Sequence, residues 1–163
     1  MSSHQAIQEA IRQSETTCQR YLDDLTDAEL LVRPVPGANH IAWQLGHLIK
    51  SEHRIMEAVS PGSMPALPPG FFEKHTNDTA TLDDPAAFYT KAEYLAVAAE
   101  QRKGTLAALE RLKEEDFARP APESLQRIAP TVLGMFVMQS THWTMHAGQW
   151  VIVRRKLGRK PLF

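Results

Sequence analysis

The sequence contains very little cysteine and has no excess of charge of either sign. Its single cysteine, Cys18, excludes an intrachain disulfide and indicates a reducing compartment, so we expect a cytoplasmic protein. Eighteen Lys and Arg residues stand against nineteen Asp and Glu residues, which gives a formal net charge of −1 at pH 7. A chain so balanced has no overall field that would attract nucleic acid or an anionic membrane, and we expect it to bind neither.

Gly-rich phosphate-binding loops, short alternating runs typical of strands and a secretory signal are also missing. One stretch, residues 128–153, has no Asp, Glu, Lys or Arg and is about as long as a bilayer helix. Its polar side chains would be costly in hydrocarbon, so we interpret it as a helix in the middle of a soluble protein, buried on more than one side. The residues that argue against a membrane span are Pro130, Gln139, Ser140, Thr141, His142, Thr144, His146 and Gln149.

What the chain does contain is a helical pattern. Its 163 residues, 43% of them apolar, suffice for one compact domain, which we assign to residues 1–163. Apolar residues recur at steps of three and four in four segments, and this periodicity is typical of amphipathic helices. The predicted helices cover about 3–22, 39–60, 84–113 and 130–156.

Capping residues and the connections refine this prediction. We expect Asn39 to cap the second helix, Asp84 and Pro85 to begin the third, and Pro130 to lie in the first turn of the fourth. The proline-rich connection of residues 60–83 is long enough to span the length of a bundle, so the second and third helices can run parallel. We therefore predict an all-α four-helix bundle with a long crossover between helices 2 and 3.

The histidines offer a candidate metal site. His142 and His146 are four residues apart on one helix, so their rings project to the same side, and that spacing can bind one metal ion. The alternative is a pair of core histidines that are hydrogen-bonded to other groups, and the spacing alone does not separate the two. His47, on the second helix, is the candidate third ligand, with His40 two turns earlier on the same side, although a lone His47 also fits a half-buried histidine. Three nitrogens would leave coordination positions open, as a catalytic metal requires.

Other candidates have a structural interpretation beside the functional one. Gln139, one turn before His142, would either orient a metal-bound water or serve as a core amide bonded to the backbone. Cys18 has neither a paired cysteine nor an adjacent cation, and we interpret it as a buried structural residue. No acid–base group stands out, so the catalytic residues stay unassigned. The three tryptophans would either line a pocket or pack in the core or at a dimer interface. They are Trp43, Trp143 and Trp150.

Two motifs make the chain similar to a known family. Residues 39–48, NHIAWQLGHL, and residues 142–150, HWTMHAGQW, resemble the DinB-like superfamily of four-helix proteins, which includes the YfiT-type thiol transferases, and the closing residues 153–163 are similar to those of many members. The resemblance implies an up-down-down-up bundle that is commonly a homodimer. It also implies a divalent metal ion, often nickel or zinc, at the positions that match His47, His142 and His146.

The chemistry expected of such a metal is activation of a nucleophile. The pKa of a bound water falls from 15.7 towards about 7, and a bound thiol ionises in the same field. The resemblance favours the thiol, for transfer to an electrophile or for thiol-assisted isomerisation, and the most plausible activity is a transferase that joins a low-molecular-weight thiol to a small electrophile. A metal-dependent hydrolase and a non-catalytic dimeric bundle that binds a metal ion or a small ligand remain as alternatives.

Overall fold

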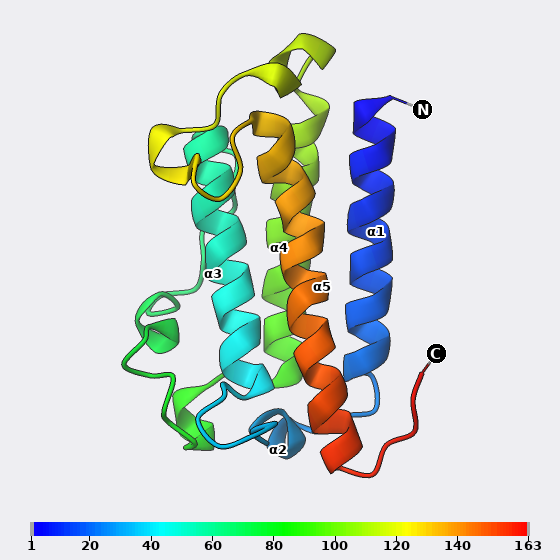
Figure 1. Cartoon of the computed structure of the whole chain (residues 1–163). Helices are drawn as coiled ribbons and strands as arrows, with labels where there is room; N and C mark the ends of the chain where they lie inside the picture. The colour runs from blue at the N-terminus through cyan, green and yellow to red at the C-terminus, as the bar shows by residue number, and fades with distance from the viewer. Residues whose placement is uncertain (1, 163) are drawn as a thin grey trace.

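Four long helices form the body of the molecule (Figure 1). The computed structural model describes residues 2–162, and within them there is no strand, which confirms the all-α prediction. Short 3-10 turns at Glu73–His75, Pro85–Ala87, Glu114–Ala118 and Glu123–Leu125 lie in the connections. The α-helices are α1 (Ser3–Leu22), α2 (Asp27–Leu30), α3 (Ile41–Val59), α4 (Lys91–Glu110) and α5 (Val132–Lys156), of which α2 is a single turn.

The long helices run in two directions (Figure 1). From the N-terminus α1 descends in this view, α3 and α4 both ascend, and α5 descends again. The connection between α3 and α4 therefore returns along the outside of the bundle. α1 packs mainly on α5, and α3 packs on both α5 and α4, so the seam between α1 and α4 is the most sparsely packed of the four.

The first helix has the predicted bounds, but the second begins later than predicted. His40, not Asn39, is the N-cap of α3, because its Nδ1 accepts a hydrogen bond of 3.1 Å from the main-chain N–H of Trp43. The opposite ring nitrogen, Nε2, lies 3.0 Å from the carbonyl oxygen of Leu82 and donates to it. His40 is completely buried in this role, and it is not part of the candidate metal site.

The third helix also begins later than the sequence predicts. Asp84 does cap a turn with Pro85 at its first position, but this turn is a 3-10 helix that ends at Ala87. Thr90 then caps α4 in a capping box with Glu93, which satisfies two main-chain donors at once. The fourth helix likewise begins at Val132 with Thr131 as its cap, so Pro130 lies outside it.

His75 anchors the crossover to α3. Its side chain is completely buried, and burial lowers its pKa to about 4, so the ring is neutral. Nδ1 donates to the carbonyl oxygen of Phe71 over 2.8 Å, and Nε2 accepts from the hydroxyl of Tyr94 over 2.7 Å. The ring lies directly on Gly46, where an added Cβ would overlap it. The absence of a side chain at Gly46 thus lets the crossover reach the helix one residue before His47.

α5 is buried on the sides that face α1 and α3, but it leaves one face open. Among residues 2–162 no helix is both long enough and apolar enough to cross a membrane. The open face nevertheless carries large apolar side chains at intervals of four, eight and seven residues, which places them on one stripe. The residues of this stripe are Leu133, Val137, Met145 and Ile152.

We expect Gly46→Ala to destabilise the fold. The added methyl group overlaps the buried ring of His75, and overpacking of this kind costs about 1–3 kcal/mol, which exceeds the gain of about 1 kcal/mol in helix propensity. Gly148→Ala is the matched control, because a Cβ at Gly148 in α5 meets nothing within 4 Å. Urea denaturation should show a lower midpoint for the first variant and an equal or higher midpoint for the second, and an unchanged midpoint for Gly46→Ala would contradict this packing.

Candidate metal centre

His47 on α3 and the pair His142 and His146 on α5 come together at the seam between these helices. Their candidate ligand nitrogens all lie within 4.8 Å of one another, and Nε2 of His47 is 3.3 Å from Nε2 of His142. The ring centroids are 5.0 to 5.4 Å apart. Two Zn–N bonds of about 2.0–2.1 Å at a tetrahedral angle place their nitrogens roughly 3.3–3.4 Å apart, so the His47–His142 pair has a spacing that suits one cation.

Trp43 holds the ring of His47. The two side chains are one turn apart on α3, and their rings are stacked with a centroid distance of 5.3 Å and an interplanar angle of 8°. The indole is itself fixed, because its Nε1 donates to the carbonyl oxygen of Thr76 and to the hydroxyl of Thr79 in the crossover. The crossover therefore sets the plane of the His47 ring through Trp43.

Gln44 fixes the tautomer of His146. Its Oε1 lies 2.8 Å from Nε1 of Trp150 and 3.0 Å from Nδ1 of His146. Its Nε2 donates to the carbonyl oxygen of Asn39 and to Oε1 of Gln149. An indole N–H can only donate and a main-chain carbonyl can only accept, so the amide orientation is determined from both ends. Nδ1 of His146 must then carry the proton. Nε2 therefore has the free lone pair that can bind a metal ion.

Burial keeps all three imidazoles neutral near pH 7. Desolvation is the largest cause for each ring: it lowers the pKa of His47 below its ordinary 6.5, with a further contribution from Lys50. The pKa of His142 and that of His146 fall to about 4, and neighbouring histidines add to the effect. A neutral imidazole has the free lone pair that metal coordination needs, so these rings require no deprotonation at neutral pH.

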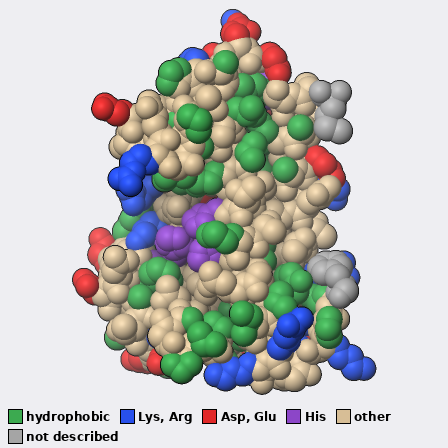
Figure 2. Space-filling model, viewed as in Figure 1, with side chains coloured by type: hydrophobic (Ala, Val, Ile, Leu, Met, Phe, Trp, Pro, Cys, Tyr) green, Lys and Arg blue, Asp and Glu red, His purple; other side chains and the backbone are tan. Residues whose placement is uncertain are grey.

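An open groove adjoins two of the three histidines. It has a volume of about 530 Å³ and is lined by His47 and His142 together with apolar and hydroxyl side chains. Figure 2 shows histidine side chains at the surface in a hollow of this face. Three protein ligands leave at least one coordination position free, and the groove gives a small molecule access to these rings. The other residues that line it are Ser51, Ile55, Ile128, Met138, Thr141 and Met145.

The donor set fits a borderline divalent cation. Three imidazoles suit zinc, nickel or copper, whereas magnesium and calcium prefer carboxylate and carbonyl oxygens, of which this cluster has none. Within residues 2–162 no other group of three or more His, Cys, Asp or Glu side chains converges in this way. His47, His142 and His146 are thus the residues that could hold a metal ion.

The remaining sequence candidates do not belong to this cluster. Gln139 donates to the carbonyl oxygen of Met135, as expected of a core amide bonded to the backbone rather than of a residue that orients a metal-bound water. Cys18 is buried, and burial raises its pKa to about 12, in agreement with a structural role. Trp43 and Trp150 support the histidines, whereas Trp143 donates to Glu52 in the core.

Gln44 is the residue that the sequence analysis did not single out. It is completely buried, and it lies three residues before His47 in the first motif. The sequence holds one indication of its role: Gln44 lies one turn from a candidate ligand on an apolar helix face, and a buried amide there needs hydrogen-bond partners. The partners themselves are more than a hundred positions away, at His146 and Trp150, and only the fold reveals them.

We expect Gln44→Met to weaken metal binding by roughly 10–100-fold, because loss of an outer hydrogen bond to a ligating histidine has effects of this size. The variant also leaves the buried N–H groups of His146 and Trp150 without their acceptor. Competition against a chromophoric chelator measures the affinity. Gln139→Met is the matched control, since it removes an equally buried amide that bonds only within α5, and equal affinities for the two variants would contradict the role of Gln44.

Comparison with known proteins agrees with this architecture. A crystal structure of a conserved protein from Enterococcus faecalis superposes with a TM-score of 0.71 over 98% of this chain and 99% of that chain, at 20% identity, which concerns the fold alone. No curated protein sequence is significantly similar to this chain. The family model described as the DinB superfamily matches residues 10–150. Because this match covers most of its length, the chain belongs to the DinB superfamily.

Proposed function

We propose that this chain is a divalent-metal-dependent transferase that joins a low-molecular-weight thiol to a small electrophile. Nickel or zinc is the proposed cation, with His47, His142 and His146 as its ligands. The observation that carries the proposal is the convergence of three neutral imidazoles beside an open groove. Membership of the DinB superfamily supports it, because the YfiT-type thiol transferases belong to the group that the sequence resembles.

A divalent cation bound there would lower the pKa of a thiol or water that reaches it, and would so supply a nucleophile at neutral pH. The chain's own residues prepare the site: Gln44 directs Nε2 of His146, and Trp43 holds the plane of His47. Ile55 and Met138 give the groove an apolar wall for the body of an electrophile. In the reaction the thiol releases its proton to water, its sulfur bonds to the electrophilic carbon, and the leaving group departs with the bonding electron pair.

The composition of the groove favours thiol transfer over hydrolysis. None of the residues that line it is a carboxylate or an amine, so no side chain is placed to protonate a poor leaving group. Attack by a thiolate on a carbon with a good leaving group needs no such acid. A hydrolase remains the second candidate because Ser51 and Thr141 offer hydroxyls that would orient a water. A non-catalytic metal-binding bundle is the third.

We also propose that the whole chain forms one domain with up-down-down-up helix order, and that it works in the cytoplasm. The directions of α1, α3, α4 and α5 support the helix order (Figure 1). The lone buried Cys18 supports a reducing compartment, because the chain has no second cysteine with which to form a disulfide.

The metal and thiol requirements are tested on protein purified without a histidine tag. Elemental analysis by inductively coupled plasma mass spectrometry should detect about one divalent ion per chain. The His142→Ala variant should lose that ion. With 1-chloro-2,4-dinitrobenzene as electrophile, turnover should require both the ion and an added thiol. Absence of bound metal even after supplementation would remove the proposed chemistry, whereas hydrolysis of 4-nitrophenyl acetate in thiol-free buffer would favour the hydrolase.

A homodimer is the proposed assembly, through the apolar stripe of Leu133, Val137, Met145 and Ile152. Hydrophobic side chains also lie over α5 on the face that Figure 2 presents. Light scattering should give the mass of a dimer for the native chain and of a monomer for Val137→Glu with Ile152→Glu. Val35→Glu, at an exposed apolar residue in the loop between α2 and α3 and outside the stripe, is the control, and a native monomer or a dimer that survives the paired substitution would contradict this interface.

A further inference from the structure

A second groove, which we call the cationic groove, lies between α3 and the crossover and has a volume of about 490 Å³. Two of its residues, Lys50 and Arg54, follow His47 by three and seven positions, so the three side chains share one side of α3. Figure 2 shows Lys or Arg side chains beside the histidines on the same face of the molecule. The residues that line the cationic groove are Lys50, Arg54, Phe72, Glu73 and Thr76.

The two cations of this groove have no counterion. Neither Lys50 nor Arg54 forms an ion pair within residues 2–162. They are four residues apart on α3, and like charges at this spacing repel each other. Lys50 is half-buried, and its burial, together with the charge of Arg54, lowers its pKa below the ordinary 10.5. Both cations would therefore be stabilised by an anion in the groove.

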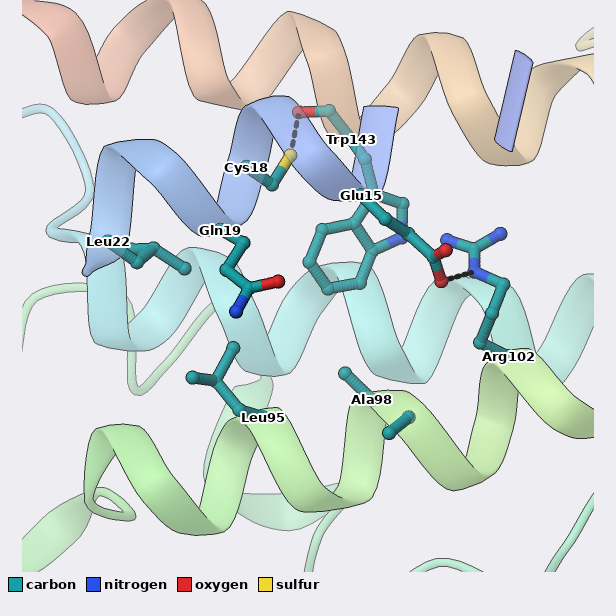
Figure 3. A pocket seen from close by; sticks show the side chains of 9 residues that line it. Glu15, Cys18, Gln19, Leu22, Leu95, Ala98, Arg102 and Trp143 are labelled. Carbon is teal, nitrogen blue, oxygen red and sulfur yellow. Dashed lines mark hydrogen bonds and ion pairs between the residues drawn. The ribbon is translucent and has the colours of Figure 1, made fainter. Parts of the chain in front are cut away.

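The cavity between α1 and α4 has the opposite arrangement, because its cation is already paired. Figure 3 shows Arg102 facing Glu15, with which it pairs over 3.1 Å, and a second pair joins it to Glu52 over 3.2 Å. The ammonium group of Lys50, in contrast, donates only to the main-chain carbonyl oxygen of His75, which leaves two of its three N–H donors free. The guanidinium of Arg54 is exposed and makes no hydrogen bond to the described part of the chain.

The charge of the cationic groove suits a carboxylate. Two cations and one carboxylate, that of Glu73, give its lining a formal charge of +1, which a monoanion balances and a dianion exceeds. A guanidinium binds a carboxylate through two parallel hydrogen bonds. The field of Lys50 also reaches the candidate metal centre, since it contributes to the lowered pKa of His47. A divalent cation on His47 would be repelled by Lys50, and an anion beside Lys50 would weaken that repulsion.

We propose that Lys50 and Arg54 bind a carboxylate of the thiol substrate. This inference rests on the proposed function, and it assigns the thiol and the electrophile to different grooves: the electrophile keeps the apolar groove of the candidate metal centre. At 1.5 Å per residue, Lys50 and Arg54 lie about 4.5 and 10.5 Å from His47 along the axis of α3. The substrate is therefore a thiol whose sulfur and carboxylate are separated by several bonds.

Three thiols with the same alkyl chain and different charge test the proposal: 6-mercaptohexanoate, 6-mercaptohexanol and 6-aminohexanethiol. With 1-chloro-2,4-dinitrobenzene as electrophile, kcat/KM for the carboxylate should exceed that for the alcohol at least about tenfold, because hydrogen bonds between charged groups are the strong ones. The amine should have the lowest value. Equal values for the carboxylate and the alcohol would overturn the proposal.

Lys50→Gln with Arg54→Gln should abolish the preference for the carboxylate. Arg155→Gln with Lys160→Gln is the matched control, because it removes two exposed positive charges near the C-terminal end of α5 and should keep the preference. Thermal melting establishes that each variant is folded. If the first pair fails to fold, Arg54→Gln alone decides, since that exposed side chain has no hydrogen bond to lose. A preference that survives in the folded variant would contradict the role of these cations.

A binding measurement separates this proposal from the proposed transferase. The indole N–H of Trp43 donates to the carbonyl oxygen of Thr76, which lines the cationic groove, so it reports occupancy in ¹H–¹⁵N spectra of the full chain. Hexanoate should shift this signal and saturate, 1-hexanol should not, and Arg54→Gln should weaken the binding of hexanoate. Such binding without turnover of any thiol would support the carboxylate site and remove the transferase. Turnover without saturable binding of hexanoate would overturn the carboxylate site and keep the transferase.

Discussion

The candidate site depends on one oxygen atom, Oε1 of Gln44, which accepts hydrogen bonds from Trp150 and His146 at the same time. Both donors come from α5 and the acceptor comes from α3, so the pair of bonds fixes how these helices lie against each other in rotation and in register. A slide of α5 by one turn, about 5.4 Å, would break both bonds and leave three buried polar groups without partners. The arrangement that selects the tautomer of His146 is therefore also one that holds the bundle in its observed packing.

α5 serves two sides of the molecule through adjacent residues. His142 and His146 converge with His47 at the groove, whereas Trp143 donates to Glu52 in the core and borders a cavity of about 320 Å³ between α1 and α4. The step of one residue turns a side chain by about 100° around a helix, so a single helix can line two separate spaces. Residues 132–153 of α5 carry no charge, and polar N–H groups buried among them, those of Gln139, His146 and Trp150, have hydrogen-bond acceptors within the protein.

Periodicity in the sequence predicts the helices and the common side of His142 and His146 well, because both follow from local spacing, whereas only the fold brings His47 to them. The bounds of α1 and the facing of His142 and His146 need only the 3.6-residue period. The errors have long-range causes. His40 replaces Asn39 as a cap because Leu82, in the distant crossover, accepts from the other side of its ring. His75 lies in the long crossover, and only the fold shows that it is buried against Gly46.

The neutrality of the three candidate ligands has a consequence for the chemistry that such a site can support. Three imidazoles with lowered pKa values bring no negative charge, so a divalent cation among them would keep its whole charge. The low polarity of the groove wall, with Ile55, Ile128 and Met138, would weaken the screening of that charge. An anionic partner of small size, such as a thiolate or a hydroxide, is what such a centre stabilises most. A soft thiolate matches a borderline cation with nitrogen ligands better than a hard oxygen does, and the lining has no carboxylate that would compete for the open position.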